Sequence, residues 1–239
     1  MLLTMPLGPL WQTQGSESRS SAEPIVARIF TCDEDRDHLF AARYRGFRDA
    51  GLAVPTADGL FRDRYDDMPS TLLIGVYAGA RPVGTMRVCT WHPETGGGVP
   101  CEEVYSEVAG IKAAAAGPVV ELSRLAVEHS AVPMARRTAV YAQLVRMGLL
   151  VCFATDVDRT LVAAHEQWRT FYERIFGFRT VAGPEPYPPG HDPVILLHRS
   201  FRTGSKRSAL RNPFFRITPH DIAELRHALG GMADVGSCR

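Results

Sequence analysis

The sequence predicts an α/β protein (α+β in some schemes) in which helices flank a mixed, mostly antiparallel, twisted sheet. Strand-like runs alternate with helical patterns along the chain, in the order strand–helix, hairpin, strand–helix, strand–helix, strand. Two neighbouring strand-like runs are joined by a short turn that contains glycine, which predicts an antiparallel pair. Such an order favours one layered domain over about residues 25–200, without internal repeats.

The first half of this domain opens with a β-branched run and a helical pattern. Residues 25–30 predict a strand, and Thr31 to Asp33 offer capping side chains before a helix. Residues 51–68 contain Pro55, Gly59 and many Asp and Arg side chains, and predict an ordered polar loop. The apolar positions of the helical pattern are Leu39, Tyr44, Phe47 and Leu52. The predicted hairpin consists of strands at Thr71–Ala78 and Pro82–Thr90, joined by Gly79-Ala80-Arg81.

The middle of the chain contains its most distinctive strand. Residues 91–117, with three consecutive glycines, predict an irregular insertion with one short helix near Glu102 to Ile111. Residues 119–127 predict a strand in which Glu121 and Arg124 interrupt a run that otherwise reads as buried. Because buried charged side chains are costly, this strand is the first candidate to carry catalytic residues.

The second half predicts a long core helix and two further strands. Over residues 134–153 the apolar stripe is Val140, Leu144, Met147 and Val151, a spacing typical of a buried helix face. Further elements are expected as a strand at 159–165, a helix at 166–176 ending at Gly177, a strand at 193–198, and a short helix at 219–229. The last of these lies in a basic C-terminal extension, residues 201–239, and residues 1–24 are expected to form a disordered leader.

Composition excludes several classes of protein. Of the 239 residues, 45% are hydrophobic, and 27 Lys and Arg nearly balance 26 Asp and Glu, which argues against global disorder and against a strongly basic nucleic-acid binder. The apolar run at residues 147–154 is far shorter than the roughly 18 residues of a membrane span, so no transmembrane segment is expected. The leader lacks a basic start, so a secretory signal is not expected either.

The cysteines point to a reducing compartment. They stand at positions 32, 89, 101, 152 and 238, with no Cys-x-x-Cys pair and no histidine at zinc-ligand spacing. Neither a disulfide framework nor a metal site is predicted. We therefore expect reduced thiols and a cytoplasmic protein.

Three segments carry a resemblance to a known family: Asp63-Arg64-Tyr65-Asp66, Val83-Gly84-Thr85-Met86-Arg87 and Glu121-Leu122-Ser123-Arg124-Leu125-Ala126-Val127. Together with Phe171-Tyr172 and Phe176-Gly177-Phe178, their order and spacing resemble the autoinducer-synthase branch of the GNAT acyltransferases. That branch contains the LuxI-type acyl-homoserine-lactone synthases and the N-acyl amino acid synthases. The resemblance covers about residues 25–200 and implies a GNAT-like fold of αβα layers.

Two features favour the N-acyl amino acid synthases within this branch. The stretch Gly183-Pro184-Glu185-Pro186-Tyr187-Pro188-Pro189-Gly190 looks more like these enzymes, and Ala53 stands where lactone synthases carry a Trp. The resemblance implies transfer of a long fatty acyl group from acyl carrier protein to the amine of an amino acid. The thioester carries the energy, so neither a metal nor another cofactor is expected, and acyl carrier protein or coenzyme A brings the acyl group as substrate.

The candidate catalytic residues are Glu121, Ser123 and Arg124. Acyl transfer needs a base for the ammonium group of the acceptor, and Glu121, acting through a water, is the candidate. The alternative is that Glu121 only pairs with a nearby arginine. Strict alternation would place Glu121 and Arg124 on opposite faces of the sheet, so the resemblance implies a β-bulge near Ser123 or Leu125 that brings both to one site and frees backbone N–H groups for the oxyanion.

The candidate acceptor site is a charged cluster with one aromatic residue. An arginine can hold the carboxylate of an amino acid, and an aspartate can hold its amine. A purely structural ion network is the alternative. The residues that match the family at these positions are Arg43, Phe47, Asp63, Asp66 and Arg87.

The candidate acyl-donor site includes the end of the central strand and the start of the long helix: Leu125, Val127, Arg136, Arg137 and Ala139. Many GNAT enzymes cradle the pyrophosphate of coenzyme A with glycines here, and this chain has none in residues 136–141. Two cations at a helix start oppose its dipole, which suggests an external anion such as the phosphate of phosphopantetheine. The basic run from Arg199 through Arg202, Lys206, Arg207 and Arg211 to Arg216 could dock an acidic carrier protein, or could be an ordinary solvated tail.

Three other functions remain open from the sequence. The first is synthesis of an acyl-homoserine lactone from S-adenosylmethionine. The second is acetyl transfer from coenzyme A. The third is a non-enzymatic GNAT-like domain that binds an acyl ligand or carrier protein, although the charges of Glu121 and Arg124 would then be buried without a use.

Overall fold

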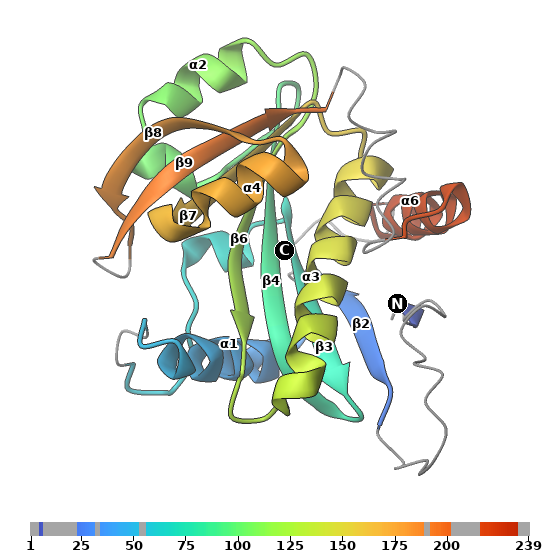
Figure 1. Cartoon of the computed structure of the whole chain (residues 1–239). Helices are drawn as coiled ribbons and strands as arrows, with labels where there is room; N and C mark the ends of the chain where they lie inside the picture. The colour runs from blue at the N-terminus through green and yellow to red at the C-terminus, as the bar shows by residue number, and fades with distance from the viewer. Residues whose placement is uncertain are drawn as a thin grey trace.

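The computed structural model describes residues 5–6, 23–31, 34–52, 56–188, 192–201 and 216–233. Within these residues, nine strands form one sheet in the order β1-β2-β3-β4-β6-β7-β9-β8, with β5 paired to β4 (Figure 1). Only β6 and β7 are parallel neighbours among these strands. The strands are β1 (Met5–Pro6), β2 (Ile25–Phe30), β3 (Thr71–Ala78), β4 (Arg81–His92), β5 (Gly96–Gly97), β6 (Val119–Val127), β7 (Arg159–His165), β8 (Arg179–Pro186) and β9 (Pro193–Ser200).

Helices cover both faces of the sheet, as the αβα prediction requires. They are α1 (Asp37–Asp49), η2 (Arg64–Asp67), η3 (Pro100–Glu103), α2 (Glu107–Ala113), α3 (Met134–Ala154), η4 (Glu166–Trp168), α4 (Arg169–Phe176) and α6 (Pro219–Ala233). Alternate residues of β3 show the two faces: Leu73 and Tyr77 pack with Leu39 of α1, whereas Ile74 and Val76 belong to the core beneath α3. The predicted fold class is therefore confirmed.

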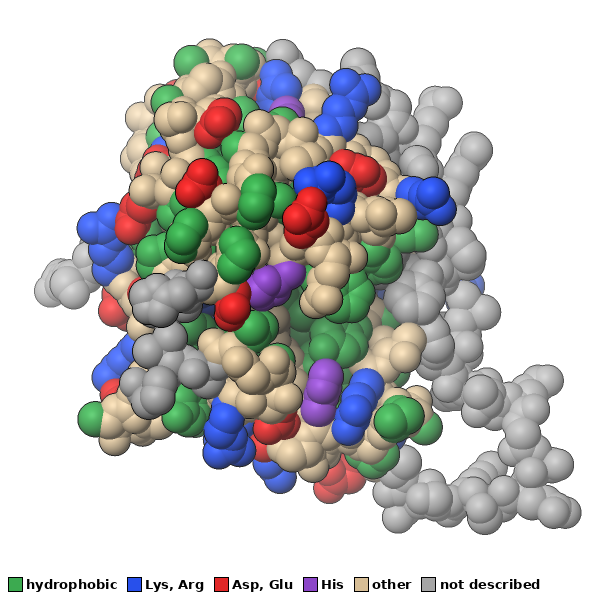
Figure 2. All heavy atoms as spheres, turned by 60° about the vertical axis from the view of Figure 1, so that its left-hand side comes forward, with side chains coloured by type: hydrophobic (Ala, Val, Ile, Leu, Met, Phe, Trp, Pro, Cys, Tyr) green, Lys and Arg blue, Asp and Glu red, His purple; other side chains and the backbone are tan. Residues whose placement is uncertain are grey.

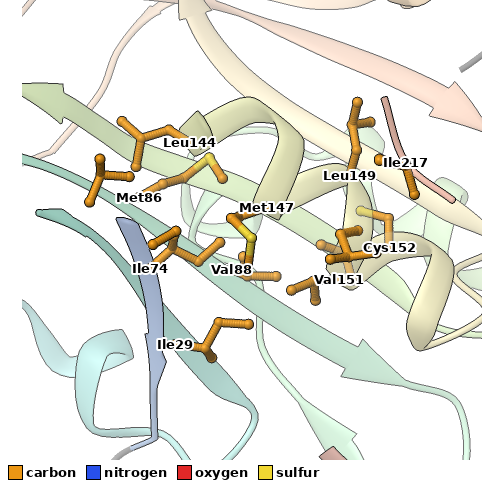
Figure 3. Close-up of a cluster of buried hydrophobic side chains, with 14 of the residues drawn as sticks. Ile29, Ile74, Met86, Val88, Leu144, Met147, Leu149, Val151, Cys152 and Ile217 are labelled. Atoms are coloured by element: carbon orange, nitrogen blue, oxygen red, sulfur yellow. The ribbon is translucent and has the colours of Figure 1, made fainter. Parts of the chain in front are cut away.

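The main core lies between α3 and the sheet. All four residues of the predicted stripe on α3 are buried, and Met86 and Val88 of β4 face them (Figure 3). The close approach of β4 to α3 depends on Gly84, because a Cβ at this position would lie 2.8 Å from a methyl group of Val140. By length and composition α3 would also pass as a membrane span, but 67% of its most apolar window is buried in the protein.

A second core covers the other face at the far end of the sheet. Residues 91–117 were predicted as an irregular insertion with one short helix near Glu102 to Ile111. The helix is present as α2, but the rest of the segment is more regular than predicted, because it continues β4 to His92 and then forms β5 and η3. Cys101, Tyr105 and Val108 pack there against Val119 of β6 and Leu161 of β7. The segment is thus a structural layer, and it places the backbone of η3 beside β6.

Strand β6 is irregular on both of its sides. On one side it pairs with β7 only over Val119–Glu121, and the two parallel strands then separate. On the other side Thr85 pairs with Ala126 and Arg87 with Ser123, so that Arg124 and Leu125 together oppose Met86 alone. Arg124 has a φ of 54°. The predicted bulge near Ser123 or Leu125 is confirmed.

The C-terminal helix is part of the fold. It was expected at residues 219–229 in an appended extension, and α6 instead packs on α3, with Leu225 only 1% exposed. Arg226 donates to the carbonyl oxygens of Ala154 (3.0 Å) and Phe153 (3.3 Å), where α3 ends. The apolar face of α6 therefore completes the main core.

The structure differs from the prediction at three smaller places. Helix α1 begins at Asp37, and its N-cap residue is Arg36, which makes no side-chain cap, and not Thr31. The other residues of the expected cap, Cys32 and Asp33, lie outside the described residues. Strand β8 was not predicted, because Pro184 and Pro186 argue against a strand, yet prolines are tolerated at a sheet edge such as this one. Within the expected disordered leader, Met5 and Pro6 pair with β2.

We predict that Leu225→Ala lowers the free energy of unfolding by about 2–4 kcal/mol, because it removes a fully buried side chain between α6 and α3. Urea unfolding followed by circular dichroism measures the change. His227→Ala, on the exposed side of the same helix, is the control and should unfold like the wild type. Equal stability of Leu225→Ala and wild type would show that α6 does not stabilise the core.

Candidate active site

Three arginines and two aspartates form a continuous ion network on the face of the sheet that carries α1. Arg43 of α1 contacts both carboxylate oxygens of Asp66 at 2.9 Å. Arg87 of β4 contacts Asp63 at 2.5 Å and Asp66 at 3.3 Å. Arg124 of β6 reaches the other oxygen of Asp63 at 2.8 Å. The four charged residues predicted around the acceptor are therefore brought together, and the catalytic candidate Arg124 joins them.

The bulge puts Arg124 in this network. Before it, Val120 faces the core under α3, and Glu121 and Ser123 face the opposite side. Regular alternation would turn Arg124 toward α3, but its left-handed backbone turns the side chain toward Asp63 instead. Ser123 accepts a hydrogen bond from the Nε of Arg87 at 3.3 Å. Residues 121, 123 and 124 thus share one face, as predicted.

Asp63 is more accessible to solvent than Asp66, the other acid of the network. Its side chain is 26% exposed, whereas that of Asp66 is fully buried. Burial alone would raise the pKa of Asp63, but the nearby guanidinium groups of Arg87 and Arg124 outweigh burial and lower the pKa from 3.8 to about 2. Asp63 also accepts a hydrogen bond from the Tyr65 N–H at the start of η2. The carboxylate is therefore ionised at neutral pH and fixes both the loop and two arginines.

Glu121 lies at the point where β6 leaves β7. The side chain is completely buried. One carboxylate oxygen accepts a hydrogen bond from the backbone N–H of Cys101 in η3 (2.7 Å), and the other accepts one from the hydroxyl of Tyr187 (2.9 Å). Among the residues that the structure describes, no Arg, Lys or His forms an ion pair with Glu121, so the alternative of a structural pairing with an arginine does not hold there.

Tyr187 and Pro188, which follow β8, bridge the two sides of the bulge. Besides the bond from Tyr187 to Glu121, the carbonyl oxygen of Pro188 accepts a hydrogen bond from Arg124 at 2.9 Å. The guanidinium of Arg124 lies 5.9 Å from the ring of Tyr187 and 5.0 Å from that of Phe61. Sequence reasoning gave Tyr187 no role, although it stands in the Gly183–Gly190 stretch that carried part of the resemblance.

Phe47 lies one layer away from the network. Its ring packs on Phe61 at 4.8 Å between centroids, and Phe61 in turn lies under the guanidinium of Arg124. The backbone carbonyl of Phe61 accepts a hydrogen bond from Arg43 at 3.2 Å. Phe47 therefore supports the aromatic side of the cluster through Phe61.

The candidate donor residues lie around the separated end of β6. Leu125 and Val127 are beyond the last pair that β6 makes with β7, and the N-cap of α3, Pro133, provides no side-chain hydrogen bond. Arg137 donates to the backbone carbonyls of His129 (2.8 Å) and Val132 (3.1 Å), and Arg136 donates to that of Glu23. The cations at this helix start therefore already have internal partners, which the sequence did not predict. Ala139 packs against the main core.

The predicted basic run from Arg199 to Arg216 lies only partly within the described residues. Arg199, expected in an exposed basic run, is instead 9% exposed on β9 with its guanidinium 4.8 Å from the ring of Phe201. Arg216 is exposed. The other four basic residues of the run lie outside the described residues: Arg202, Lys206, Arg207 and Arg211. Ala53, which stands where lactone synthases carry a Trp, also lies outside them.

The surface is hollowed on the side of the molecule turned forward in Figure 2. Hydrophobic side chains form the floor of this hollow, and histidine and charged side chains stand at its edge. Within the described residues, no group of three or more His, Cys, Asp or Glu side chains could hold a metal ion. The described cysteines, Cys89, Cys101 and Cys152, are free and buried.

The mixed sheet with two separating parallel strands, the buried carboxylate at the point of separation and the adjacent Arg–Asp network agree with the GNAT-like acyltransferase that the resemblance implied. The family model of the N-acyl amino acid synthase FeeM matches residues 38–200. Since this is well over half of the chain, the protein belongs to the FeeM family of N-acyl amino acid synthases.

Solved structures share the fold at low sequence identity. FeeM, an N-acyl amino acid synthase from uncultured soil microbes, is 20% identical with a TM-score of 0.63, over 76% of this chain and 92% of FeeM. The acyl-homoserine-lactone synthase LasI is 16% identical with a TM-score of 0.58, over 77% of this chain and 93% of LasI. BjaI, a CoA-dependent acyl-homoserine-lactone synthase solved with S-adenosylmethionine and isopentyl-CoA, is 18% identical with a TM-score of 0.51, over 84% and 88%. No curated protein sequence matches the chain significantly.

We predict that Asp63→Asn lowers the free energy of unfolding by about 2 kcal/mol at pH 7. This is the stabilisation that corresponds to the lower pKa of Asp63 in the folded protein. Because that pKa is lower in the folded state, the stabilisation is complete above about pH 5 and is lost as the pH falls toward about 2. The penalty of the substitution should therefore shrink with falling pH in urea unfolding experiments. Asp67→Asn, which changes an exposed partner of Arg36, is the control, and a pH-independent penalty would contradict the assignment.

Proposed function

We propose that this enzyme transfers a long-chain fatty acyl group from acyl carrier protein to the amine of an amino acid and releases an N-acyl amino acid. The observation that carries the proposal is the buried Glu121 carboxylate, which lies without an ion-pair partner among the described residues beside the Arg–Asp network. A base next to a site for a charged acceptor is what amide formation from a thioester requires.

In the proposed reaction the amine attacks the carbonyl carbon of the thioester. Glu121 accepts a proton from the ammonium group, directly or through a water, which frees the lone pair for the new C–N bond. Backbone N–H groups of β6 beyond Glu121, where β7 no longer pairs, stabilise the oxyanion. In the tetrahedral intermediate the attacking nitrogen carries a positive charge. It gives its extra proton, directly or through water, to the departing thiolate, which leaves as the thiol of the carrier, and the proton held by Glu121 passes to solvent. Bond making and breaking balance without any other reactant.

The acceptor is proposed to bind on the side of Asp63. Asp63 is the partly exposed acid of the network and suits an ammonium group, while Arg124 suits a carboxylate. Within the described residues, the Nη2 of the buried Arg87 has no hydrogen-bond partner and provides a further donor once Asp63 turns toward a ligand. These charges support a zwitterionic amino acid as the acceptor.

The donor is proposed to be acyl carrier protein. No glycine stands in residues 136–141 to admit a pyrophosphate, and Arg136 and Arg137 bind backbone carbonyls. A single phosphopantetheine phosphate needs less room at the start of α3 than the pyrophosphate of coenzyme A. Acyl carrier proteins are acidic, so exposed basic residues such as Arg216 favour their approach.

We predict that cells expressing the wild-type enzyme accumulate an amide-linked fatty acyl amino acid and that Glu121→Gln lowers its amount at least about 100-fold, the scale of a lost general base. Mass spectrometry of organic extracts measures the product and names both substrates. The melting temperature should be unchanged, because Gln has the same shape as Glu.

Glu128→Gln is the matched control, since Glu128 is buried just beyond β6 but pairs with Arg45 and Arg81. This variant should still form the product. A lactone in the extracts would instead favour synthesis of an acyl-homoserine lactone. Wild-type and Glu121→Gln extracts that are identical would contradict the proposed function and favour a binding domain.

We also predict that the purified enzyme has a kcat/KM about tenfold or more higher with an acyl group on carrier protein than with the same group on coenzyme A, a difference of about 1.4 kcal/mol. Added salt should lower the affinity for the carrier protein, because the contact is electrostatic. Equal efficiency with both donors, or a salt-independent affinity, would contradict the carrier-protein assignment.

A further inference from the structure

Tyr187 and Pro188, the two residues that directly follow β8, contact the site at two points. Tyr187 donates its hydroxyl proton to Glu121, and the next residue, Pro188, accepts a hydrogen bond from Arg124. The two contacts lie on either side of the bulge in β6. One short segment thus ties together the candidate base and the arginine beside it.

The carboxylate of Glu121 is held at both oxygens. The Cys101 N–H binds one of them from η3, and the Tyr187 hydroxyl binds the other. Each oxygen of a carboxylate has a second lone pair, so two fixed donors orient the group and still leave it able to accept a proton. A base held in this way has a defined direction toward its substrate.

Three titratable groups from different elements feel the charge of Glu121, and all three are neutral near pH 7: Cys101 of η3, Cys89 of β4, and Tyr187 after β8. Burial, and then the charge of Glu121, raise the pKa of the Cys101 thiol well above 9.0. Burial raises the pKa of Cys89 on β4 to about 12 despite the neighbouring Arg87. Burial and Glu121 likewise raise the pKa of Tyr187 well above 10.0, although Arg124 opposes the shift. The hydroxyl of Tyr187 therefore remains a donor throughout the working range.

We infer that Tyr187 is a positioning residue for acyl transfer, whose hydroxyl aims the Glu121 carboxylate at the acceptor amine. The inference rests on the proposed function, in which Glu121 is the base. Tyr187 acts through Glu121 and takes no proton itself. Its ring has a separate part, because it lies against the guanidinium of Arg124.

The test is Tyr187→Phe, which removes the hydroxyl and keeps the ring. A hydrogen bond from a neutral donor to an ionised carboxylate stabilises the charged form. Without it, the pH at which kcat is half-maximal on the acid side should rise by about one unit, and kcat should fall about ten- to a hundredfold, the range of one hydrogen bond to a charge. The KM values for both substrates should change less than about twofold, because neither is placed against this hydroxyl.

Tyr105→Phe is the matched control. Its hydroxyl is also buried in this part of the fold, but it donates to the backbone carbonyl of Val194 and not to Glu121. Loss of that bond should leave the acid side of the profile where it is in the wild type. An unchanged profile in Tyr187→Phe, or an equal shift in both variants, would overturn the inference.

A second measurement separates this inference from the proposed function. The protein is labelled with 3-fluorotyrosine, and the Tyr187 signal is identified by its loss in Tyr187→Phe. Glu121→Gln should shift this fluorine resonance and leave that of Tyr105 in place. No shift would overturn the inference whatever the activity. If the wild type makes no acylated product while the shift is observed, the proposed function fails, and Tyr187 is reduced to a structural partner of Glu121.

Discussion

The site depends on the neutralisation of one buried cation. Arg87 stands in the middle of the sheet with no exposed surface, and an unpaired charge in such a place would cost several kcal/mol. Asp63 and Asp66 provide the compensation from a single turn, in which Asp63 caps η2 and Asp66 accepts the backbone N–H of Asp63. The polar loop after α1 is therefore held on the sheet by its charge pairs with Arg87.

The bulge in β6 determines which residues can act together. It reverses the alternation of the strand after Ser123, so that Arg124 faces Asp63 while Leu125 returns to the core under α3. Glu121 precedes the bulge and faces the same side, held from η3 and from the segment after β8. Elements far apart in the sequence thus converge on a stretch of four residues.

The regular elements and the charged residues of the site were predictable from the sequence, for physical reasons. The stripe of α3 and the bounds of β2, β3, β6 and β7 follow from apolar periodicity, and Glu121 and Arg124 stood out because charged side chains are unusual in a buried strand. The other charges, Arg43, Asp63, Asp66 and Arg87, were identified through the family resemblance and not from local pattern. The partners of Arg136 and Arg137 were not predictable, because they are backbone carbonyls, which every residue type carries. The contact of Tyr187 with Glu121 spans 66 positions in the sequence, and β8 was hidden by its prolines.

The short contact between β6 and β7 also has a mechanical meaning. Through three residue pairs it joins a larger half of the sheet, which ends at β6, to a smaller half formed by β7, β9 and β8. Glu121 belongs to the last of these pairs. When two plates turn about a common edge, points at that edge move least and points far from it move most. Any rotation of the two halves about this edge would therefore widen or narrow the gap near Val127 and His165 and leave Glu121 almost at rest.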